Sequence, residues 1–295
     1  MKISSPDLSK TIAIIAGSGT FPLSIAQNAH KQGAHIAIVA FNGYTSKKIE
    51  EFCQSCIWIN VGELTKMLSF LKKEKAAYAI FAGTISHEEA LKPLDKIRAL
   101  ADIKTLKFVM SLKNKTTKSI LNALIDMFKE EGITTLPSYS FLEHDLVPEK
   151  TLTKRQAGSH ELSQVRQGFI IAKKLSSLDI GLTVCMSGGA AIAVEAMEGT
   201  DECIKRAGNI FNKFFKKKDL KPGEGITIVK VARPDQDARY DLPIIGPSTI
   251  QSMLESQATC LACEAKWTLM MEHQDMINLA NSGKITIVGV SGDKV

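Results

Sequence analysis

The sequence has few aromatic residues and no long apolar run. Aromatic residues make up 6% of the 295 residues, which is too few for an extended surface that stacks the bases of single-stranded nucleic acid. No apolar run reaches the roughly 18 residues that a helix needs to span a membrane. Residues 1–6 lack the apolar segment of a signal peptide. We therefore expect a cytoplasmic protein whose cysteines are free thiols.

Several catalytic signatures are also missing. The chain has no Gly-x-Ser-x-Gly elbow, no Walker loop and no His-Glu-x-x-His motif. The six histidines are dispersed along the chain, which gives no support to a hydrolase centre of two histidine-bound metals. The net charge of +6 mildly favours anionic partners. It is too scattered to predict nucleic-acid binding.

The N-terminal half alternates apolar strands with helices. Strand patterns lie at residues 11–16, 35–41, 57–59, 78–81 and 133–136, and helical patterns at 23–32, 62–73 and 106–131. This alternation predicts a Rossmann-like α/β domain, in which helices cover both faces of a parallel sheet. The irregular, charged stretch 141–156 marks a boundary, so we predict an N-terminal domain over residues 1–145.

Residues 146–295 predict a second α/β domain, with a ligand cleft between the two domains. Strands are expected at 183–186, 191–196, 226–231, 259–262 and 285–290, and helices at 161–175, 248–255, 273–281 and from 200 onward. Thr200 is expected to cap the last of these helices. Asp201 and Glu202 follow in its first turn, where the helix dipole favours acids.

Two glycine loops follow predicted strands. Gly17-Ser-Gly19-Thr20 precedes a helix, so its backbone amides and the helix dipole suit a phosphate. Gly83-Thr84 ends another strand, and carboxyl strand ends line the ligand crevice of open α/β sheets. The dinucleotide fingerprint is incomplete, because Pro22 replaces its third glycine and no acid directly follows the second strand. An NAD-dependent oxidoreductase and a plain tight turn stay open as alternatives.

The stretch from Lys230 to Gly246 alternates acids and bases between prolines. Such a stiffened, charged loop suits a site that holds a metal or a phosphate. Glu195, Glu198 and Asp201 lie where a strand ends and a helix begins, and their carboxylates suit a hard cation such as Mg²⁺. Helix capping explains Asp201 but neither glutamate.

Two cysteine pairs, Cys53/Cys56 and Cys260/Cys263, have the spacing of zinc ligands. A structural zinc site needs four converging ligands. The second pair lies in a strand, where residues three apart point to opposite faces. Buried free cysteines are therefore favoured over zinc.

One helix combines phenylalanines with a basic end. It contains Phe211, Phe214 and Phe215, with lysines at 213 and 216–218. This pattern fits an amphipathic surface on an anionic membrane. It fits equally a core helix whose lysines are solvated near its C-terminus.

Three blocks, at residues 15–22, 193–201 and 229–250, resemble the UDP-2,3-diacylglucosamine pyrophosphatases of the LpxI type, which lack a calcineurin-like dimetal core. Phe81-Ala-Gly83 and Asp179-Ile-Gly181 are weaker matches. The blocks keep their order and spacing over nearly the whole chain. The third block is long and specific, whereas the first block alone would mean little.

The resemblance implies Mg²⁺-dependent hydrolysis of UDP-2,3-diacylglucosamine to UMP and 2,3-diacylglucosamine 1-phosphate in lipid A synthesis, with water attacking the α-phosphorus of UMP. It also implies two α/β domains with the substrate between them, and a homodimer. A lipid substrate implies transient contact with the inner membrane surface.

The resemblance also places the site. The family's essential aspartate falls on Asp241. The expected catalytic residues are Asp241, Lys230 and Arg239; the expected Mg²⁺ ligands are Asp241, Glu195, Glu198 and Asp201; the expected substrate-binding residues are Gly17, Gly19, Thr20, Gly83, Thr84 and Thr200.

Two positions depart from the family pattern. Lys113-Asn-Lys-Thr-Thr117 replaces a Lys-Gly-Asp-Asp-like turn, and Leu182 replaces a glutamine. A homologue that binds the UDP-sugar lipid without turnover is therefore the alternative.

Overall fold

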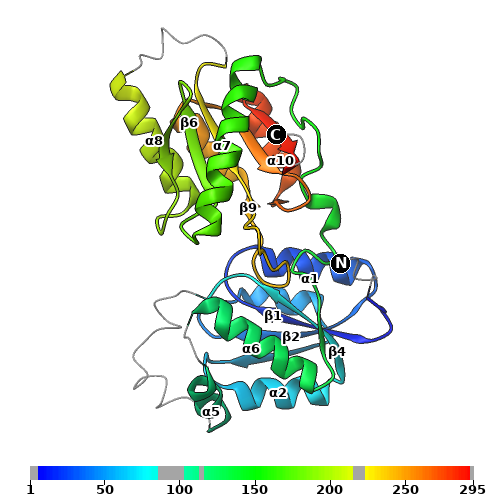
Figure 1. Ribbon diagram of the computed structural model, residues 1–295. Coiled ribbons are helices and arrows are strands. Elements are labelled where there is room, and N and C mark those ends of the chain that lie inside the picture. The colour runs from blue at the N-terminus through cyan, green and yellow to red at the C-terminus, as the bar shows by residue number, and fades with distance from the viewer. Residues whose placement is uncertain (1–5, 86–102, 113–115, 215–222, 293–295) are drawn as a thin grey trace. The chain divides into compact units, whose positions relative to one another are not determined.

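The computed structural model describes residues 6–85, 103–112, 116–214 and 223–292. The chain forms two compact units (Figure 1). The N-terminal unit contains residues 1–143 and 238–240, and the C-terminal unit contains 144–237 and 241–295. The division after residue 143 lies near the predicted boundary at 145/146. Residues 238–240 differ from the prediction, because they belong to the N-terminal unit.

The N-terminal unit is built on a parallel sheet of five strands in the order β3-β2-β1-β4-β5. Its strands are β1 (Thr11–Ala16), β2 (His35–Phe41), β3 (Ser55–Ile59), β4 (Ala76–Ala82) and β5 (Thr134–Thr135); its helices are α1 (Phe21–Lys31), η1 (Lys47–Phe52), α2 (Leu64–Lys73), α5 (Ile103–Ser111) and α6 (Thr117–Glu130). The predicted parallel α/β architecture is confirmed.

Alternating side chains explain why both faces of this sheet are covered. Ala13 and Ile15 of β1 join a buried cluster with side chains of α2 and α6, among them Phe128. Ile12 and Ile14 alternate with them and are fully buried, so they face the other side of the sheet. Helix α1 packs against β1, β2 and β4 and lies opposite α2 and α6 (Figure 1).

The single helix predicted over 106–131 is wrong. The chain forms α5 and α6 instead, and Leu112 between them is not helical. Thr116 has extended backbone angles and caps α6, because its side chain accepts a hydrogen bond from Ser119 N at 3.2 Å. Residues 113–115, which include most of the expected acid turn, lie outside the described residues.

The C-terminal unit is a mixed sheet in the order β12-β10-β8-β6-β7. Strands β8, β10 and β12 are parallel, and β6 is antiparallel to β7 and β8. The elements are η2 (Glu143–Asp145), α7 (Ser159–Ser177), β6 (Thr183–Ser187), β7 (Ala190–Val194), α8 (Thr200–Phe214), β8 (Ile226–Lys230), β9 (Ile244–Ile245), α9 (Pro247–Glu255), β10 (Ala258–Glu264), β11 (Leu269–Met270), α10 (His273–Ser282) and β12 (Thr286–Val290). The short parallel pair β9 and β11 was not predicted.

Strand β10 separates two cores in this unit. Cys260 packs with α7 side chains such as Phe169. Cys263 packs on the other face with side chains of α8, α9 and α10, including Phe211. The predicted opposite orientation of the two cysteines is confirmed, so they do not converge on one zinc ion. Burial raises the pKa of the Cys263 thiol to about 12.

The structure describes only part of the helix that was predicted to contact a membrane. Phe211 is 2% exposed and belongs to the core, whereas Phe214 is 76% exposed. Phe215 and the lysines at 216–218 lie outside the described residues. Within the described ranges, no helix has the length and apolar character needed to cross a membrane.

Replacing Phe128 with alanine is expected to destabilise the N-terminal unit by about 3–5 kcal/mol, the cost of emptying a buried aromatic site. Phe128 is fully buried and stacks on Phe81 with ring centroids 5.6 Å apart. The measurement is the free energy of unfolding in urea. The control is the same substitution at exposed Phe214, which should change it by less than about 1 kcal/mol. Equal effects at the two positions would contradict the assigned core.

Candidate functional site

The two glycine loops hydrogen-bond to each other. Ser18 N donates to Thr84 O at 2.8 Å, and Gly17 N donates to Ala82 O at 2.8 Å. A Cβ atom on Gly17 would lie 2.7 Å from Thr84 O, and one on Gly83 would lie 2.4 Å from Ser18 O. Glycine is required at both positions by this close approach of two backbones. The amides of Gly17 and Ser18 are therefore engaged inside the protein.

The start of α1 faces solvent, and so do Gly83 and Thr84 of the other loop. Gly19 and Thr20 are exposed, and Gly19 has a φ of +92°. Thr20 is the N-cap residue, but its side chain makes no capping hydrogen bond. A helix N-terminus favours an anion. Of the predicted phosphate-binding residues in this unit, Gly19 and Thr20 are the best placed.

A polar chain in the C-terminal unit joins Lys230, Thr200 and Glu195. Lys230 is 5% exposed, and its Nζ donates to Thr200 Oγ1 at 2.6 Å. The Thr200 hydroxyl in turn donates to Glu195 Oε1 at 2.9 Å, and Leu182 N donates to Glu195 Oε2 at 3.3 Å. A buried ammonium is costly unless it is hydrogen-bonded, so Thr200 has a structural task here.

Thr200 is therefore not the predicted cap. It is the first residue of α8, and its hydroxyl is engaged with Lys230 and Glu195. Gly199 precedes it, and the Gly199 carbonyl accepts from Cys203 N at 3.1 Å. Asp201 lies in the first turn as predicted.

Two helix N-termini meet at a pocket of about 360 Å³ in the C-terminal unit. Helix α8 begins at Thr200, and α9 begins after its N-cap residue Gly246. The lining residues are Glu198, Gly199, Thr200, Asp201, Glu202, Ile244, Ile245, Gly246, Ser248 and Thr249. Helix N-termini favour negative charge, which the carboxylates of Glu198, Asp201 and Glu202 in the lining already supply. The pocket thus joins the predicted residues Glu198, Thr200 and Asp201.

The Asp241 carboxylate forms an ion pair with Arg233. A second guanidinium nitrogen of Arg233 binds Asp179 Oδ1 at 2.8 Å. The Gln236 side-chain amide donates to the Asp241 carbonyl, and Asp241 N donates to Asp237 O at 3.0 Å. These contacts link the two ends of the segment 233–241 and hold Asp241 in place.

A second ion pair anchors the start of this loop. Ala232 N donates to Glu264 Oε2 at 2.8 Å, and Lys173 Nζ donates to Ala232 O at 2.9 Å. Lys173 also binds both carboxylate oxygens of Glu264, each at 2.9 Å. Sequence reasoning missed Arg233, Lys173 and Glu264 as positioning residues. Of these three, only Arg233 could have been found from the sequence, because it lies inside the block 229–250 that resembles the family.

The predicted Mg²⁺ ligands do not form a preformed metal site in the described residues. Among the described residues, no three His, Cys, Asp or Glu side chains lie together as a metal site. Glu198 pairs with Arg206, whose hydrogen bond lowers the pKa of Glu198, and Asp241 pairs with Arg233. Mg²⁺ is commonly bound by one or two carboxylates with water and substrate phosphates. A site in which Asp241 is one ligand and the substrate supplies others stays a prediction.

Arg239 belongs to the N-terminal unit, in the segment 238–240. In that unit, Ser138 N donates to Ala238 O at 2.7 Å, and Tyr240 Oη donates to Asn122 Oδ1 at 3.3 Å. Lys230 and Asp241 belong to the C-terminal unit. The predicted cleft between the domains stays a prediction.

Comparison with known proteins supports the resemblance over nearly the whole chain. The family model described as LpxI N-terminal domain matches residues 11–144, and the model described as LpxI C-terminal domain matches residues 148–288. The chain is 23% identical over 281 residues to UDP-2,3-diacylglucosamine pyrophosphatase LpxI of Caulobacter vibrioides, covering 95% of this chain and 98% of that protein.

Two solved structures are similar to this chain at a distant level. N5-carboxyaminoimidazole ribonucleotide synthetase from Thermotoga maritima is 14% identical with a TM-score of 0.22, and the match covers 62% of this chain and 40% of that one. N5-carboxyaminoimidazole synthetase from Staphylococcus aureus is 12% identical with a TM-score of 0.25, over 67% of this chain and 44% of that one. Similarity at this level carries no argument about fold or function.

The substitution Thr200→Val is expected to destabilise the C-terminal unit by about 1–3 kcal/mol. It removes the hydroxyl that accepts from Lys230, so a buried ammonium loses an acceptor. The measurement is the free energy of unfolding in urea. Thr200→Ser is the matched control, because it keeps the hydroxyl, and it should retain most of the stability. If the two variants are equally stable, the hydroxyl network does not support the fold.

Proposed function

The chain belongs to the LpxI family and is a UDP-2,3-diacylglucosamine pyrophosphatase of lipid A biosynthesis, and we propose that it cleaves its substrate by Mg²⁺-assisted attack of water on the α-phosphorus of the UMP portion. The products are then UMP and 2,3-diacylglucosamine 1-phosphate. The observation that carries this mechanism is the Asp241 carboxylate, held by Arg233 in a closed loop.

Asp241 has the chemistry that this reaction needs. A carboxylate can orient the attacking water and accept its proton, provided that it is held within hydrogen-bond reach. Arg233 fixes one carboxylate oxygen of Asp241. The Asp241 side chain is 32% exposed, so it remains accessible from solvent. We assign Asp241 as the residue that positions water or metal at the phosphorus.

Mg²⁺ would be held by Asp241 and by phosphate oxygens, with Asp201 as a second protein ligand. When bound, the ion neutralises phosphate charge and lowers the pKa of water, effects worth several kcal/mol of barrier. Glu195 and Glu198 are engaged with Thr200 and Arg206. They act in this proposal by holding the polar framework of the site.

The phosphate of the UMP portion is assigned to the N-terminus of α1. Exposed Gly19 and Thr20 at the start of α1 hold the UMP portion, whereas Gly17, Gly83 and Thr84 shape that loop. Thr200 stays the predicted substrate-binding residue of the C-terminal unit, in the pocket where α8 and α9 begin. Lys230 acts through Thr200, because its ammonium is buried against that hydroxyl. Arg239 remains the candidate for stabilising charge on the phosphate oxygens.

Binding without turnover remains the second candidate, because two family positions differ. One of them, Leu182, contributes to the network through its backbone amide, which donates to Glu195 Oε2 at 3.3 Å. A glutamine at that position is not needed for this hydrogen bond.

The lipid substrate also bears on location. We propose a cytoplasmic homodimer that contacts the inner membrane surface transiently and does not bind nucleic acid. Exposed apolar side chains on the C-terminal unit support contact with lipid: Leu178 is 69% exposed, Ile180 is 43% exposed and Met197 is fully exposed.

Asp241→Asn is expected to lower the rate of UMP release from UDP-2,3-diacylglucosamine by about 100-fold or more, because the amide cannot accept a proton. The assay separates nucleotides after incubation with and without Mg²⁺, and chelation of Mg²⁺ should also stop wild-type release. Reaction in ¹⁸O-labelled water should place the label in UMP.

Asp235→Asn is the matched control, since Asp235 is an exposed acid of the same loop, and it should keep most of the activity. Normal turnover by Asp241→Asn would overturn the role of Asp241. Label in the sugar phosphate would overturn attack at the α-phosphorus. Absence of UMP from the wild-type reaction, despite tight substrate binding, would favour the second candidate.

A further inference from the structure

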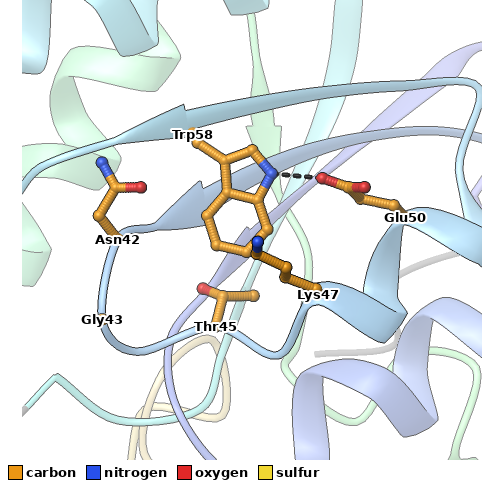
Figure 2. A pocket seen from close by; sticks show the side chains of 6 residues that line it. All are labelled: Asn42, Gly43, Thr45, Lys47, Glu50 and Trp58. Atoms are coloured by element: carbon orange, nitrogen blue, oxygen red, sulfur yellow. Dashed lines mark hydrogen bonds between the residues drawn. The ribbon is translucent and has the colours of Figure 1, made fainter.

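The N-terminal unit contains a pocket of about 420 Å³ that the assignments above do not use (Figure 2). It is lined by Asn42, Gly43, Thr45, Lys47, Glu50 and Trp58. Its volume lies within the range of about 300–1,000 Å³ that is usual for small-molecule sites. The lining combines one large aromatic surface with amide, hydroxyl, carboxylate and ammonium groups, as a site for a polar aromatic ligand requires.

The pocket lies where β2 and β3 end. The chain turns after β2, with Gly43 at a φ of +81°, and Thr45 fixes the turn because its hydroxyl accepts from Phe41 N at 2.9 Å. Trp58 and its neighbour Ile59 end the adjacent strand β3, which pairs with β2 in parallel. In open α/β sheets, ligands bind beyond the carboxyl ends of the strands.

Helix η1 brings Glu50 to the pocket. Ile49 of η1 is 1% exposed, and the Phe52 ring packs edge-on against His30 of α1 at a centroid distance of 6.0 Å. This anchoring places the Glu50 carboxylate beside Trp58, where it accepts a hydrogen bond from the indole Nε1 (Figure 2). The hydrogen bond orients the ring and the acid together.

We propose that this pocket binds the uridine portion of the substrate, with uracil stacked on Trp58 and the ribose hydroxyls bound by Glu50. The proposal rests on the proposed function, because it takes a UDP-sugar as the substrate. An aromatic face binds a base by stacking. A carboxylate near the end of the second strand is the usual acceptor for ribose hydroxyls in Rossmann-like domains.

Asn42 supplies an edge contact for the base. Its Nδ2 donates to Asn60 Oδ1 at 2.9 Å, and Figure 2 shows its Oδ1 turned toward the Trp58 side of the pocket. An amide oxygen in this position accepts a hydrogen bond from the N3–H of uracil. Lys47 adds a positive charge to the pocket lining, which favours a ligand that carries phosphates.

The distance to the phosphate-binding end of α1 suits a nucleotide. Strand β2 lies between β1, which leads into α1, and β3, which carries Trp58. Adjacent strands are about 4.8 Å apart, so β1 and β3 are separated by roughly 10 Å. A nucleotide can span this separation, with the phosphate of its UMP portion at Gly19 and Thr20 and its base at Trp58. The acid that the dinucleotide fingerprint requires is thus supplied by Glu50 from η1.

The test uses the full-length protein and UMP as the probe. The chain has two tryptophans, so Trp267→Phe leaves Trp58 as the single reporter. UMP should quench its fluorescence saturably. Asn42→Ala and Glu50→Ala should each raise the Kd for UMP, and Trp58→Phe should weaken UMP binding in calorimetry. We expect increases of about tenfold for the loss of a contact of this kind.

Glu51→Ala is the control, because Glu51 is an exposed neighbour of Glu50 on η1 and does not line the pocket. Thermal unfolding of each variant checks its fold. An unchanged Kd in all three pocket variants, quenching of Trp267 instead of Trp58, no UMP binding by the wild type, or tighter binding of AMP or NADH than of UMP would overturn the proposal.

Hydrolysis is assayed in parallel with the same variants. A raised KM with nearly unchanged kcat in Glu50→Ala supports a binding role for the pocket. An unchanged KM in all three pocket variants, in an enzyme that releases UMP, overturns the pocket while the hydrolase assignment stands. UMP binding at Trp58 without hydrolysis would instead overturn the catalytic mechanism and support the pocket.

Discussion

The Arg233 guanidinium binds two carboxylates at once, those of Asp179 and Asp241. Arginine suits this task because its planar fork presents several N–H donors in fixed directions. All three side chains are partly exposed, so the two ion pairs add little to the stability of the fold. Their effect is on geometry. Arg233 brings the Asp179-Ile-Gly181 segment to the Asp-Leu-Pro loop and holds the Asp241 carboxylate in one orientation.

Contacts beneath this loop explain why it keeps its shape. The Lys173–Glu264 ion pair binds both polar backbone atoms of Ala232, the residue before Arg233. Gly181 must be glycine, because a Cβ atom there would lie 2.0 Å from Glu195 O. The family-like blocks of the C-terminal unit are therefore joined by direct contacts, as one polar framework around Asp241 and Thr200.

Sequence patterns predicted the parts of the fold that depend on local burial. Continuous apolar runs identified the long strands, and alternation placed Cys260 and Cys263 on opposite faces of β10. The break before Thr116 was missed, because apolar periodicity continues on both sides of it. Arg233 and Glu50 were missed for another reason: their partners, Asp179 and Trp58, come from other segments, and no local pattern reports such pairing. The contribution of residues 238–240 to the N-terminal unit depends likewise on contacts far apart in the chain.

Steady-state kinetics of Arg233→Lys test most directly whether Arg233 orients Asp241 for hydrolysis. Lysine keeps the positive charge but lacks the fork that binds both carboxylates. We predict that kcat for UDP-2,3-diacylglucosamine falls about tenfold or more, because a small misplacement of a catalytic group is costly, while KM and the unfolding temperature stay close to wild type. An unchanged kcat in a folded Arg233→Lys enzyme would contradict the account.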